Sequence, residues 1–132
     1  MIVVIDVSGA VQILLKTEKA LQFKEAVDNA ATVIAPDLFV PELTNTLWKY
    51  QRAKIFSEDE CLLYIERGIK LIDNFVDSKD YWKEAFAEGV RNKHPVYDMF
   101  YAVVARRNEG VLITNDGDLA KICQQLSIGY IF

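Results

Sequence analysis

The chain alternates short, continuously apolar runs with longer helical patterns, and this alternation limits its fold more than any other feature. Residues 2–5 and 111–114 are too short and too rich in β-branched side chains for helices, so we expect buried strands there. Three further runs predict strands at 32–35, 75–76 and 128–132. Because strands that alternate with helices form parallel sheets with right-handed crossovers, the sequence predicts an α/β fold with helices on both faces.

The helices are expected in the intervals between these strands. A capping box from Ser57 to Glu60 marks the start of one of them, and Asp116 or Asp118 begins the last. The expected helices cover about 9–15, 18–30, 39–54, 58–73, 80–91, 97–108 and 116–126.

Composition indicates a soluble protein of one domain. The length of 132 residues fits a single domain, 1–132, since ~100–200 residues per domain is usual. The 52% hydrophobic and 26% charged residues are typical of a globular rather than a disordered chain. No apolar run approaches the ~20 residues that cross a bilayer, and no basic region precedes the first strand. We therefore expect a cytoplasmic protein without a membrane partner, in which Cys61 and Cys123 are buried thiols.

The charged and metal-binding side chains narrow the function further. The net charge of −4 argues against a passive nucleic-acid binder, because such proteins neutralise phosphates with basic side chains. His94 is the only histidine, and the two cysteines form no CxxC or Cys/His cluster. A His-rich zinc site is therefore excluded, and the remaining side chains suit hard, oxygen-ligated Mg²⁺ or Mn²⁺.

Four acidic residues occupy positions that an open α/β sheet could bring to one point. Asp6 and Asp116 each follow an expected strand, and Glu42 and Asp98 lie near the starts of expected helices. Ligands of such sheets bind beyond the carboxyl ends of the strands. Carboxylates gathered from distant parts of a chain repel one another unless a cation joins them, so a divalent metal site is the leading interpretation.

Several of these positions also have a purely structural interpretation. Asp6 is a candidate helix N-cap, although Ser8 could cap the same helix while hydrogen-bonding a neighbouring carboxylate. Asp98 begins a helix that is apolar nearly all round, so its carboxylate must be capped, paired or metal-bound. Asp116 lies in an Asp-Gly turn, and spacing alone does not decide whether Asp116 or Asp118 faces the site.

A polar stripe accompanies Glu42 along its helix. At ~100° per residue, Asn45, Lys49 and Arg52 fall on the same helix face as Glu42. In the functional interpretation, Glu42 is a metal ligand with the Asn45 amide beside it. Lys49 and Arg52 are then cations that follow phosphates away from the metal. In the structural interpretation, the stripe is an ordinary solvated face.

The local motifs around the four acids resemble those of a known protein family. They read Val-Ile-Asp-Val-Ser at Asp6, Pro-Glu-Leu-Thr-Asn at Glu42, Val-Tyr-Asp-Met-Phe-Tyr at Asp98 and Ile-Thr-Asn-Asp-Gly-Asp-Leu at Asp116. In order and context the set resembles the PIN-domain ribonucleases, and most of all the VapC-type toxins of prokaryotic toxin–antitoxin pairs. The resemblance spans essentially the whole chain. It implies a three-layer α/β/α fold with a five-stranded parallel sheet and an acidic pocket for Mg²⁺ or Mn²⁺. It also implies endonucleolytic cleavage of single-stranded RNA, a homodimer, and a cognate antitoxin that occludes the pocket.

The resemblance and the chemistry together suggest a role for each residue. We expect Asp6, Glu42 and Asp98 to hold the principal metal, and Asp116 to help place a second metal or the attacking water. Because crowded carboxylates raise one another's pKa values, activity is expected to rise with pH until metal binding is complete. Candidate RNA contacts are Lys49 and Arg52. Residues expected to orient the carboxylates or the scissile phosphate are Ser8, Asn45 and Thr114.

Two other functions are alternatives. A PIN-like module could bind RNA or a partner without cutting it. A phosphoryl-transfer enzyme could use Asp6 as its nucleophile. Haloacid-dehalogenase-like phosphatases usually carry a second aspartate two residues further on, where this chain has Ser8. Trp48, Tyr64 and Trp82 lie on helical patterns and belong either to the core or to an apolar interface.

Overall fold

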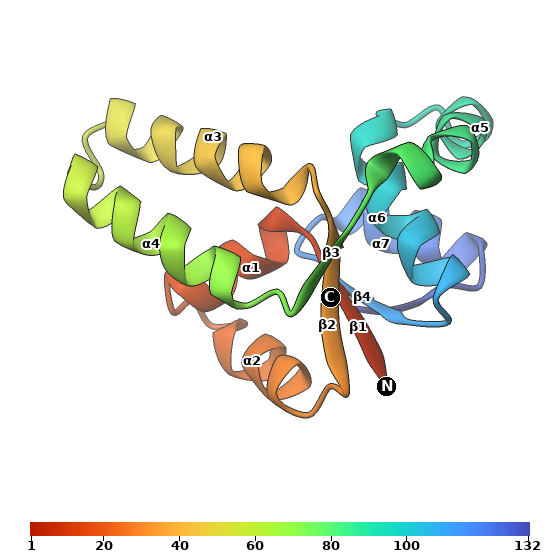
Figure 1. The fold of residues 1–132 in the computed structure, drawn as a ribbon, viewed down its shortest axis with the longest axis horizontal. Coiled ribbons are helices and arrows are strands. Elements are labelled where there is room, and N and C mark those ends of the chain that lie inside the picture. The colour runs from red at the N-terminus through yellow and green to blue at the C-terminus, as the bar shows by residue number, and fades with distance from the viewer.

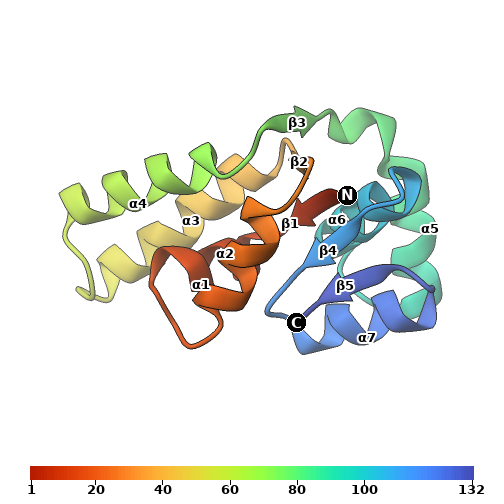
Figure 2. The same ribbon diagram turned by 90° about the horizontal axis from the view of Figure 1, so that it is seen from below.

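A five-stranded sheet forms the centre of the computed structural model, which describes residues 1–132. The strands confirm the predicted set, and their bounds are β1 Ile2–Ile5, β2 Thr32–Pro36, β3 Asn74–Val76, β4 Val111–Ile113 and β5 Gly129–Ile131. Their order in the sheet is β3-β2-β1-β4-β5, and every neighbouring pair is parallel. Figure 2 shows β1 and β4 in the interior of the sheet, with β3 and β5 toward its two edges.

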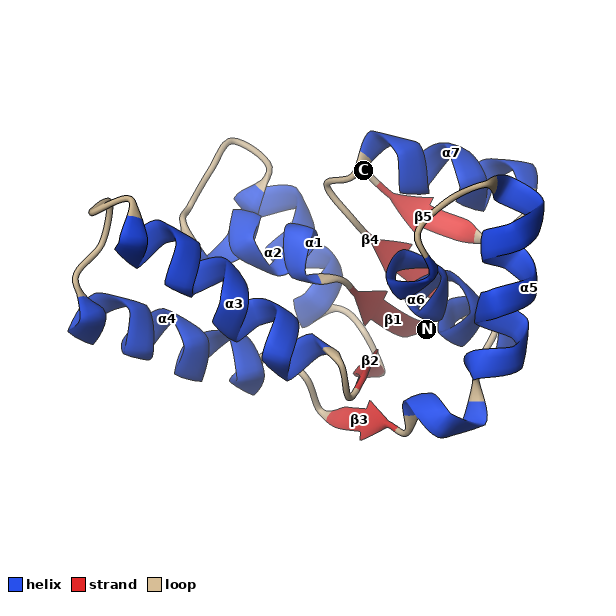
Figure 3. Cartoon of the chain, turned by 90° about the horizontal axis from the view of Figure 1, so that it is seen from above, coloured by secondary structure: helices blue, strands red, loops and turns tan.

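Helices connect the strands and cover both faces of the sheet. In chain order they are α1 Val7–Leu14, α2 Ala20–Asp28, α3 Phe39–Arg52, α4 Glu58–Lys70, α5 Trp82–Asn92, α6 Val96–Arg107 and α7 Gly117–Gln125. Figures 1 and 3 show α1 to α4 on one side of the sheet and α5 to α7 on the other. The predicted three-layer α/β/α architecture is therefore confirmed. None of these helices combines the length and the apolar character needed to cross a membrane.

Several helix limits differ from the prediction by two or three residues, and for two of them the cause is visible in the packing. Helix α4 starts at the predicted capping box but ends at Lys70 rather than near Asp73. Asp73 already pairs with β2, because its N–H donates to the carbonyl of Val33 and its carboxylate accepts from the Val33 N–H, both at 2.8 Å. Helix α5 begins at Trp82 because the preceding residues form a short 3₁₀ turn, Ser78–Asp80.

The middle of the core is formed by strand β1 and helix α6. Val3, Val4 and Ile5 are fully buried, because β1 pairs on both sides and is covered on both faces. Helix α6 packs against β1, β2 and β4 and buries six of its twelve residues, including Met99 and Tyr101. This central position explains why α6 is apolar nearly all round, and it carries the first turn of α6 to the edge of the sheet.

Helix α1 begins in close contact with β4. A Cβ atom on Gly9 would lie 3.0 Å from the carbonyl oxygen of Ile113 and 3.2 Å from a side-chain carbon of Ile5. A larger residue would therefore displace the start of the helix from the sheet. Because β1 lies between β2 and β4, the connections from β1 and β4 leave toward opposite sides of the sheet. This switch point is where open parallel sheets bind their ligands.

The cysteines and the singled-out aromatic residues have different environments. Cys61 and Cys123 are buried and unpaired, as predicted. Tyr64 packs against the core, and its ring centroid lies 5.0 Å from that of Phe56. Trp48 and Trp82 are instead 51% and 54% exposed, so these two tryptophans are not core residues.

Candidate metal centre

A cavity of about 350 Å³ lies beyond the carboxyl ends of β1 and β4. Four carboxylates from separate parts of the chain line it: Asp6 after β1, Glu42 and Asp98 in the first turns of α3 and α6, and Asp116 after β4. No lysine or arginine is among the lining residues. The cavity therefore gathers carboxylates without a basic side chain to balance them.

Asp6 is fixed by three hydrogen bonds. As the N-cap of α1, its Oδ1 accepts from the N–H of Gly9 at 2.8 Å and from the hydroxyl of Ser8 at 2.7 Å. Its Oδ2 accepts from the hydroxyl of Thr114 at 2.5 Å. The expectation that Ser8 caps this helix is wrong, because β1 ends at Ile5 and Ser8 already lies inside the first turn of α1. The hydrogen bond expected from Ser8 to a neighbouring carboxylate is present.

Ser8 and Thr114 also link the ends of β1 and β4. The hydroxyl oxygen of Ser8 accepts from the N–H of Asn115 at 2.8 Å and lies 3.2 Å from that of Thr114. The fully buried Thr114 hydroxyl oxygen accepts from the N–H of Asp116 at 3.0 Å. Thr114 thus contacts Asp6 on one side and Asp116 on the other, which couples the positions of these two acids.

Glu42 is held from across the cavity by Tyr101. The Tyr101 hydroxyl donates to Oε1 of Glu42 at 2.6 Å, which joins α6 to α3. Burial and the Glu42 carboxylate raise the pKa of Tyr101 far above its usual range, so this hydroxyl stays a donor. We did not predict Tyr101 from the sequence. The available signal was its spacing of three residues from Asp98, which places both on one face of α6.

The side chains of α3 that accompany Glu42 in the cavity differ from the predicted stripe. Thr46 and Tyr50, four and eight residues further along, line the cavity. Asn45 is exposed and lies beside Trp48 on a neighbouring surface, so the structure does not bring its amide to the carboxylates. Positions three and four residues from Glu42 both lie near it on a helix. The packing of α3 turns the second of them inward.

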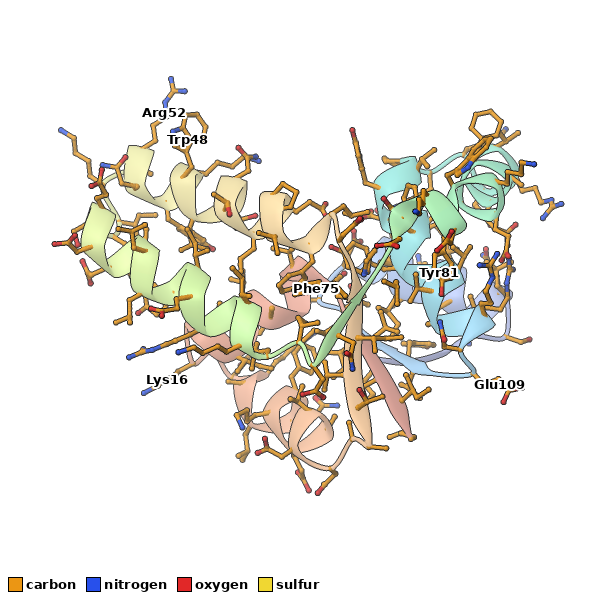
Figure 4. The ribbon with its side chains drawn as sticks, viewed as in Figure 1. Lys16, Trp48, Arg52, Phe75, Tyr81 and Glu109 are labelled. Carbon is orange, nitrogen blue, oxygen red and sulfur yellow. The ribbon has the colours of Figure 1, made fainter.

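The two cations of the stripe lie outside the cavity. Lys49 and Arg52 are exposed on the outer part of α3. The guanidinium carbon of Arg52 lies 5.4 Å from the centre of the Trp48 ring, within the range of a cation–π contact. Figure 4 shows the side chains of Trp48 and Arg52 projecting away from the body of the protein. These cations could therefore contact only those parts of a ligand that extend beyond the cavity.

Asp116 rather than Asp118 lines the cavity. Asp116 is the N-cap of α7, and its Oδ1 accepts from the N–H groups of Asp118 and Leu119 at 2.9 and 3.3 Å. Asp118 lies two residues further on, in the first turn of α7, and is exposed to solvent. The alternative left open by the sequence therefore has a geometric answer: the residue nearer the strand end faces the other acids.

His94 joins the site, although its sequence position alone led us to no role for it there. Its Nε2 lies 2.7 Å from Oδ2 of Asp98, four residues further along. One ligand atom each of His94, Asp98 and Asp116 lie within 4.8 Å of one another. No other three histidine, cysteine or acidic side chains in the chain are gathered this closely. The signal in the sequence was the four-residue step from the sole histidine to Asp98.

Burial controls the ionisation of these acids. It raises the pKa of Asp6 to about 6, although hydrogen bonds from Thr114, Gly9 and Ser8 act in the opposite direction. Burial is also the main cause of the raised pKa values of Glu42 and Asp98, and neighbouring carboxylates raise them further. The expected rise is therefore present for these three acids, with burial contributing more than crowding. A bound cation would favour the ionised forms that burial disfavours.

Comparison with known proteins identifies the family. The family model of the PIN domain matches residues 3–125, which include all four acids. The chain belongs to the PIN-domain family. It is 31% identical over 123 residues to Ribonuclease VapC3 of Pyrobaculum aerophilum, covering 89% of this chain and 92% of that protein.

Two solved structures share the fold of this PIN domain. PAE2754 from Pyrobaculum aerophilum matches with a TM-score of 0.74 and 18% identity, over 91% of this chain and 78% of the other. VapBC2 from Rickettsia felis, bound to a DNA fragment from their promoter, matches with a TM-score of 0.70 and 14% identity, over 99% and 98%. At these identities the likeness establishes the fold alone.

The donor set of this PIN domain fits a hard divalent cation. Asp6, Glu42, Asp98 and Asp116 offer carboxylate oxygens to one cavity, and Thr114 and Tyr101 hold two of these groups by hydrogen bonds. Mg²⁺ and Mn²⁺ prefer such oxygen ligands, and ligating carboxylates are typically oriented by hydrogen bonds of this kind. Because no lysine or arginine lines the cavity, a cation is the natural partner of the acids.

Proposed function

We propose that this PIN domain is a metal-dependent endoribonuclease that cleaves single-stranded RNA, and that it is the toxin of a VapBC-type toxin–antitoxin pair acting in the cytoplasm. The observation that carries the proposal is the meeting of Asp6, Glu42, Asp98 and Asp116 around one cavity without a basic residue. The 31% sequence identity to Ribonuclease VapC3, which extends over most of both chains, supports RNA as the substrate.

Asp6, Glu42 and Asp98 would hold the principal Mg²⁺ or Mn²⁺, and Asp116 would help place a second ion or the attacking water. When bound, such an ion neutralises phosphate charge, lowers the pKa of a water molecule and stabilises the leaving oxygen. The protein's contribution is to keep the carboxylates in place. Three donors fix Asp6 and the Tyr101 hydroxyl fixes Glu42, so little reorganisation accompanies binding.

The acidic cavity by itself repels RNA, so contacts away from it are needed for substrate binding. Lys49 and Arg52 on the outer part of α3 are our candidates for contacts to the RNA backbone. The exposed Trp48 ring beside Arg52 offers a surface on which an unpaired base could stack. Replacing both cations should weaken RNA binding and reduce its salt dependence while leaving metal binding unchanged.

The proposed partners are a cognate antitoxin and a second copy of the chain. VapBC2 from Rickettsia felis shares the fold of this chain, and its name denotes a VapB–VapC pair. This supports the proposal that the present chain also has an antitoxin partner. Trp82 of α5 is about half exposed, and we propose that its ring contributes to the interface with the second copy. Analytical ultracentrifugation of the purified protein tests this proposal, because a homodimer should have twice the chain mass of 15.1 kDa.

A cleavage assay tests the enzymatic proposal. Labelled single-stranded RNA is incubated with the protein in Mg²⁺, Mn²⁺ or EDTA, beside the Asp98→Asn variant. We expect internal cuts in either metal, none in EDTA, and at least ~100-fold less cleavage by Asp98→Asn, because a direct ligand is lost. Asp118→Asn is the matched control, since it makes the same change outside the cavity and should retain activity.

Two results would count against this function. Cleavage that persists in EDTA and in Asp98→Asn would exclude the metal mechanism. A folded protein that binds metal and RNA but cuts no RNA would support the alternative of a binding module.

A further inference from the structure

His94 has a position that a role in folding does not explain. Helix α6 has Pro95 as its N-cap residue and no side-chain cap, so the imidazole does not serve that end of the helix. Its side chain is only 14% exposed, and its Nε2 is directed at the carboxylate of Asp98. The ring is therefore held against the metal centre rather than in the apolar core or in solvent.

The backbone fixes His94 in this place. Lys93 ends α5 in the left-handed conformation, with φ 51° and ψ 47°, which reverses the chain direction. The N–H of His94 then donates to the carbonyl of Gly89 at 3.1 Å. A Cβ atom on Gly89 would lie only 3.2 Å from the carbonyl oxygen of His94, so this turn is tightly packed. The short connection to α6 consequently holds the imidazole over the first turn of that helix.

We propose that Nε2 of His94 is a metal ligand, which together with Asp98 and Asp116 forms a second, nitrogen-containing ion position beside the one formed by Asp6 and Glu42. This inference rests on the proposed metal centre. Asp98 is common to both positions, since its carboxylate is close to Asp116 and His94 and also lines the cavity shared with Asp6 and Glu42. The two carboxylate oxygens of Asp98 allow it to serve both.

The spacing of the three ligand atoms supports this assignment. They lie within 4.8 Å of one another, whereas adjacent ligands of one ion at about 2.1 Å are roughly 3 Å apart, so the three side chains would rotate toward a shared cation on binding. The hydrogen bond of 2.7 Å that now joins the imidazole to Asp98 would then be replaced by two bonds to the ion.

An imidazole ligand would change the choice of metal. Mg²⁺ is bound almost only by oxygen ligands, whereas imidazole nitrogen is a ligand of first-row transition metals, of which Mn²⁺ is the most weakly bound by nitrogen-containing sites. The position formed by His94, Asp98 and Asp116 should therefore favour Mn²⁺ over Mg²⁺. The position formed by Asp6, Glu42 and Asp98 contains only oxygen ligands and should discriminate less.

Pulsed electron paramagnetic resonance of bound Mn²⁺ tests the proposal without an activity measurement. Because His94 is the only histidine, a coordinated imidazole nitrogen in untagged protein can have only one source. We expect ¹⁴N coupling to Mn²⁺ in the wild type and none in His94→Gln or His94→Ala. Calorimetry should show Mn²⁺ binding at one of two positions weakened at least ~10-fold in both variants, with Mg²⁺ affinity nearly unchanged.

The pair of variants separates a ligand from a residue that only positions Asp98. Glutamine keeps a donor for the Asp98 carboxylate, so a positioning role predicts normal Mn²⁺ affinity in His94→Gln and loss only in His94→Ala. Bound Mn²⁺ without ¹⁴N coupling in the wild type would overturn the proposal while leaving the metal centre intact. Failure of the wild type to bind Mn²⁺ at all would instead overturn the metal centre itself. Circular dichroism melts verify that both variants are folded.

Discussion

Asp6→Asn should stabilise the protein in the absence of metal, although it removes a proposed ligand. Burial displaces the pKa of Asp6 from an ordinary value of 3.8 to about 6. At about 1.4 kcal/mol per pH unit, the ionised carboxylate lowers the free energy of unfolding by about 3 kcal/mol at pH 8. An amide is not ionised, so the variant escapes this penalty.

The gain should be smaller than the full penalty because the amide cannot reproduce every hydrogen bond. Asparagine caps helices as well as aspartate does, and its oxygen can still accept from Gly9 and Ser8. Its NH₂ group cannot accept the bond that Thr114 now donates. We therefore expect the variant to be more stable by about 1–2 kcal/mol at pH 8.

The pH dependence of the free energy of unfolding provides a second test of the burial penalty at Asp6. Below pH 3.8 the carboxyl group is protonated in both the folded and the unfolded state, and the penalty is absent. As pH rises from 3.8 to about 6, the unfolded chain loses its proton first, so wild-type stability falls. Above that range the penalty is constant. The stability advantage of Asp6→Asn should therefore develop between these two pH values.

Urea unfolding in EDTA, followed by circular dichroism from pH 4 to pH 8, measures the difference. Asp118→Asn is the control, because it makes the same change at an exposed position and should alter stability by less than ~0.5 kcal/mol. Adding Mn²⁺ should then stabilise the wild type more than Asp6→Asn, because the variant keeps only the position formed by His94, Asp98 and Asp116 intact. An Asp6→Asn variant that is no more stable than the wild type at pH 8 would refute the assigned burial penalty.

Three further variants test other parts of the structure. Tyr101→Phe leaves the ring but removes the donor to Glu42, so metal affinity measured by calorimetry should fall by ~10-fold without a large loss of stability. Ser57→Ala removes half of a capping box far from the cavity and should cost about 1 kcal/mol in urea unfolding with RNA cleavage unchanged. Glu88 is a buried carboxylate; burial raises its pKa, but its ion pairs with Arg106 and Arg91 outweigh burial and lower it. Glu88→Gln should therefore reduce the free energy of unfolding by about 1–3 kcal/mol at pH 7. Because a lowered pKa means stability lost as pH falls, this last difference should shrink below pH 4.5.

The strand pattern was predictable because buried parallel strands require continuous apolar runs. Residues 2–5 and 111–114 could bury both faces only inside a sheet, and the acids that follow them could lie only at its carboxyl edge. This is why the gathering of Asp6 and Asp116 was foreseeable from order alone. The choice between Asp116 and Asp118 needed the actual end of β4, which spacing does not give to within one residue.

The incorrect or missing predictions concern features that depend on tertiary packing. Asn45 and Thr46 are equally close to Glu42 on an isolated helix, and only the rotation of α3 against the sheet selects Thr46. Ser8 and Asp6 are both good helix caps, and the tight contact at Gly9 sets the helix start that makes Asp6 the cap. His94 was overlooked because it precedes the helix that carries Asp98, across a turn whose direction depends on the conformation of Lys93.

The most direct test of the central claim is a crystal structure grown with Mn²⁺ and measured at a wavelength where manganese scatters anomalously. We predict an anomalous peak inside the cavity, in contact with carboxylate oxygens of Asp6, Glu42 and Asp98. Mn²⁺ found only at surface acids such as Asp118, with the cavity carboxylates free of metal, would contradict the assignment of a metal centre.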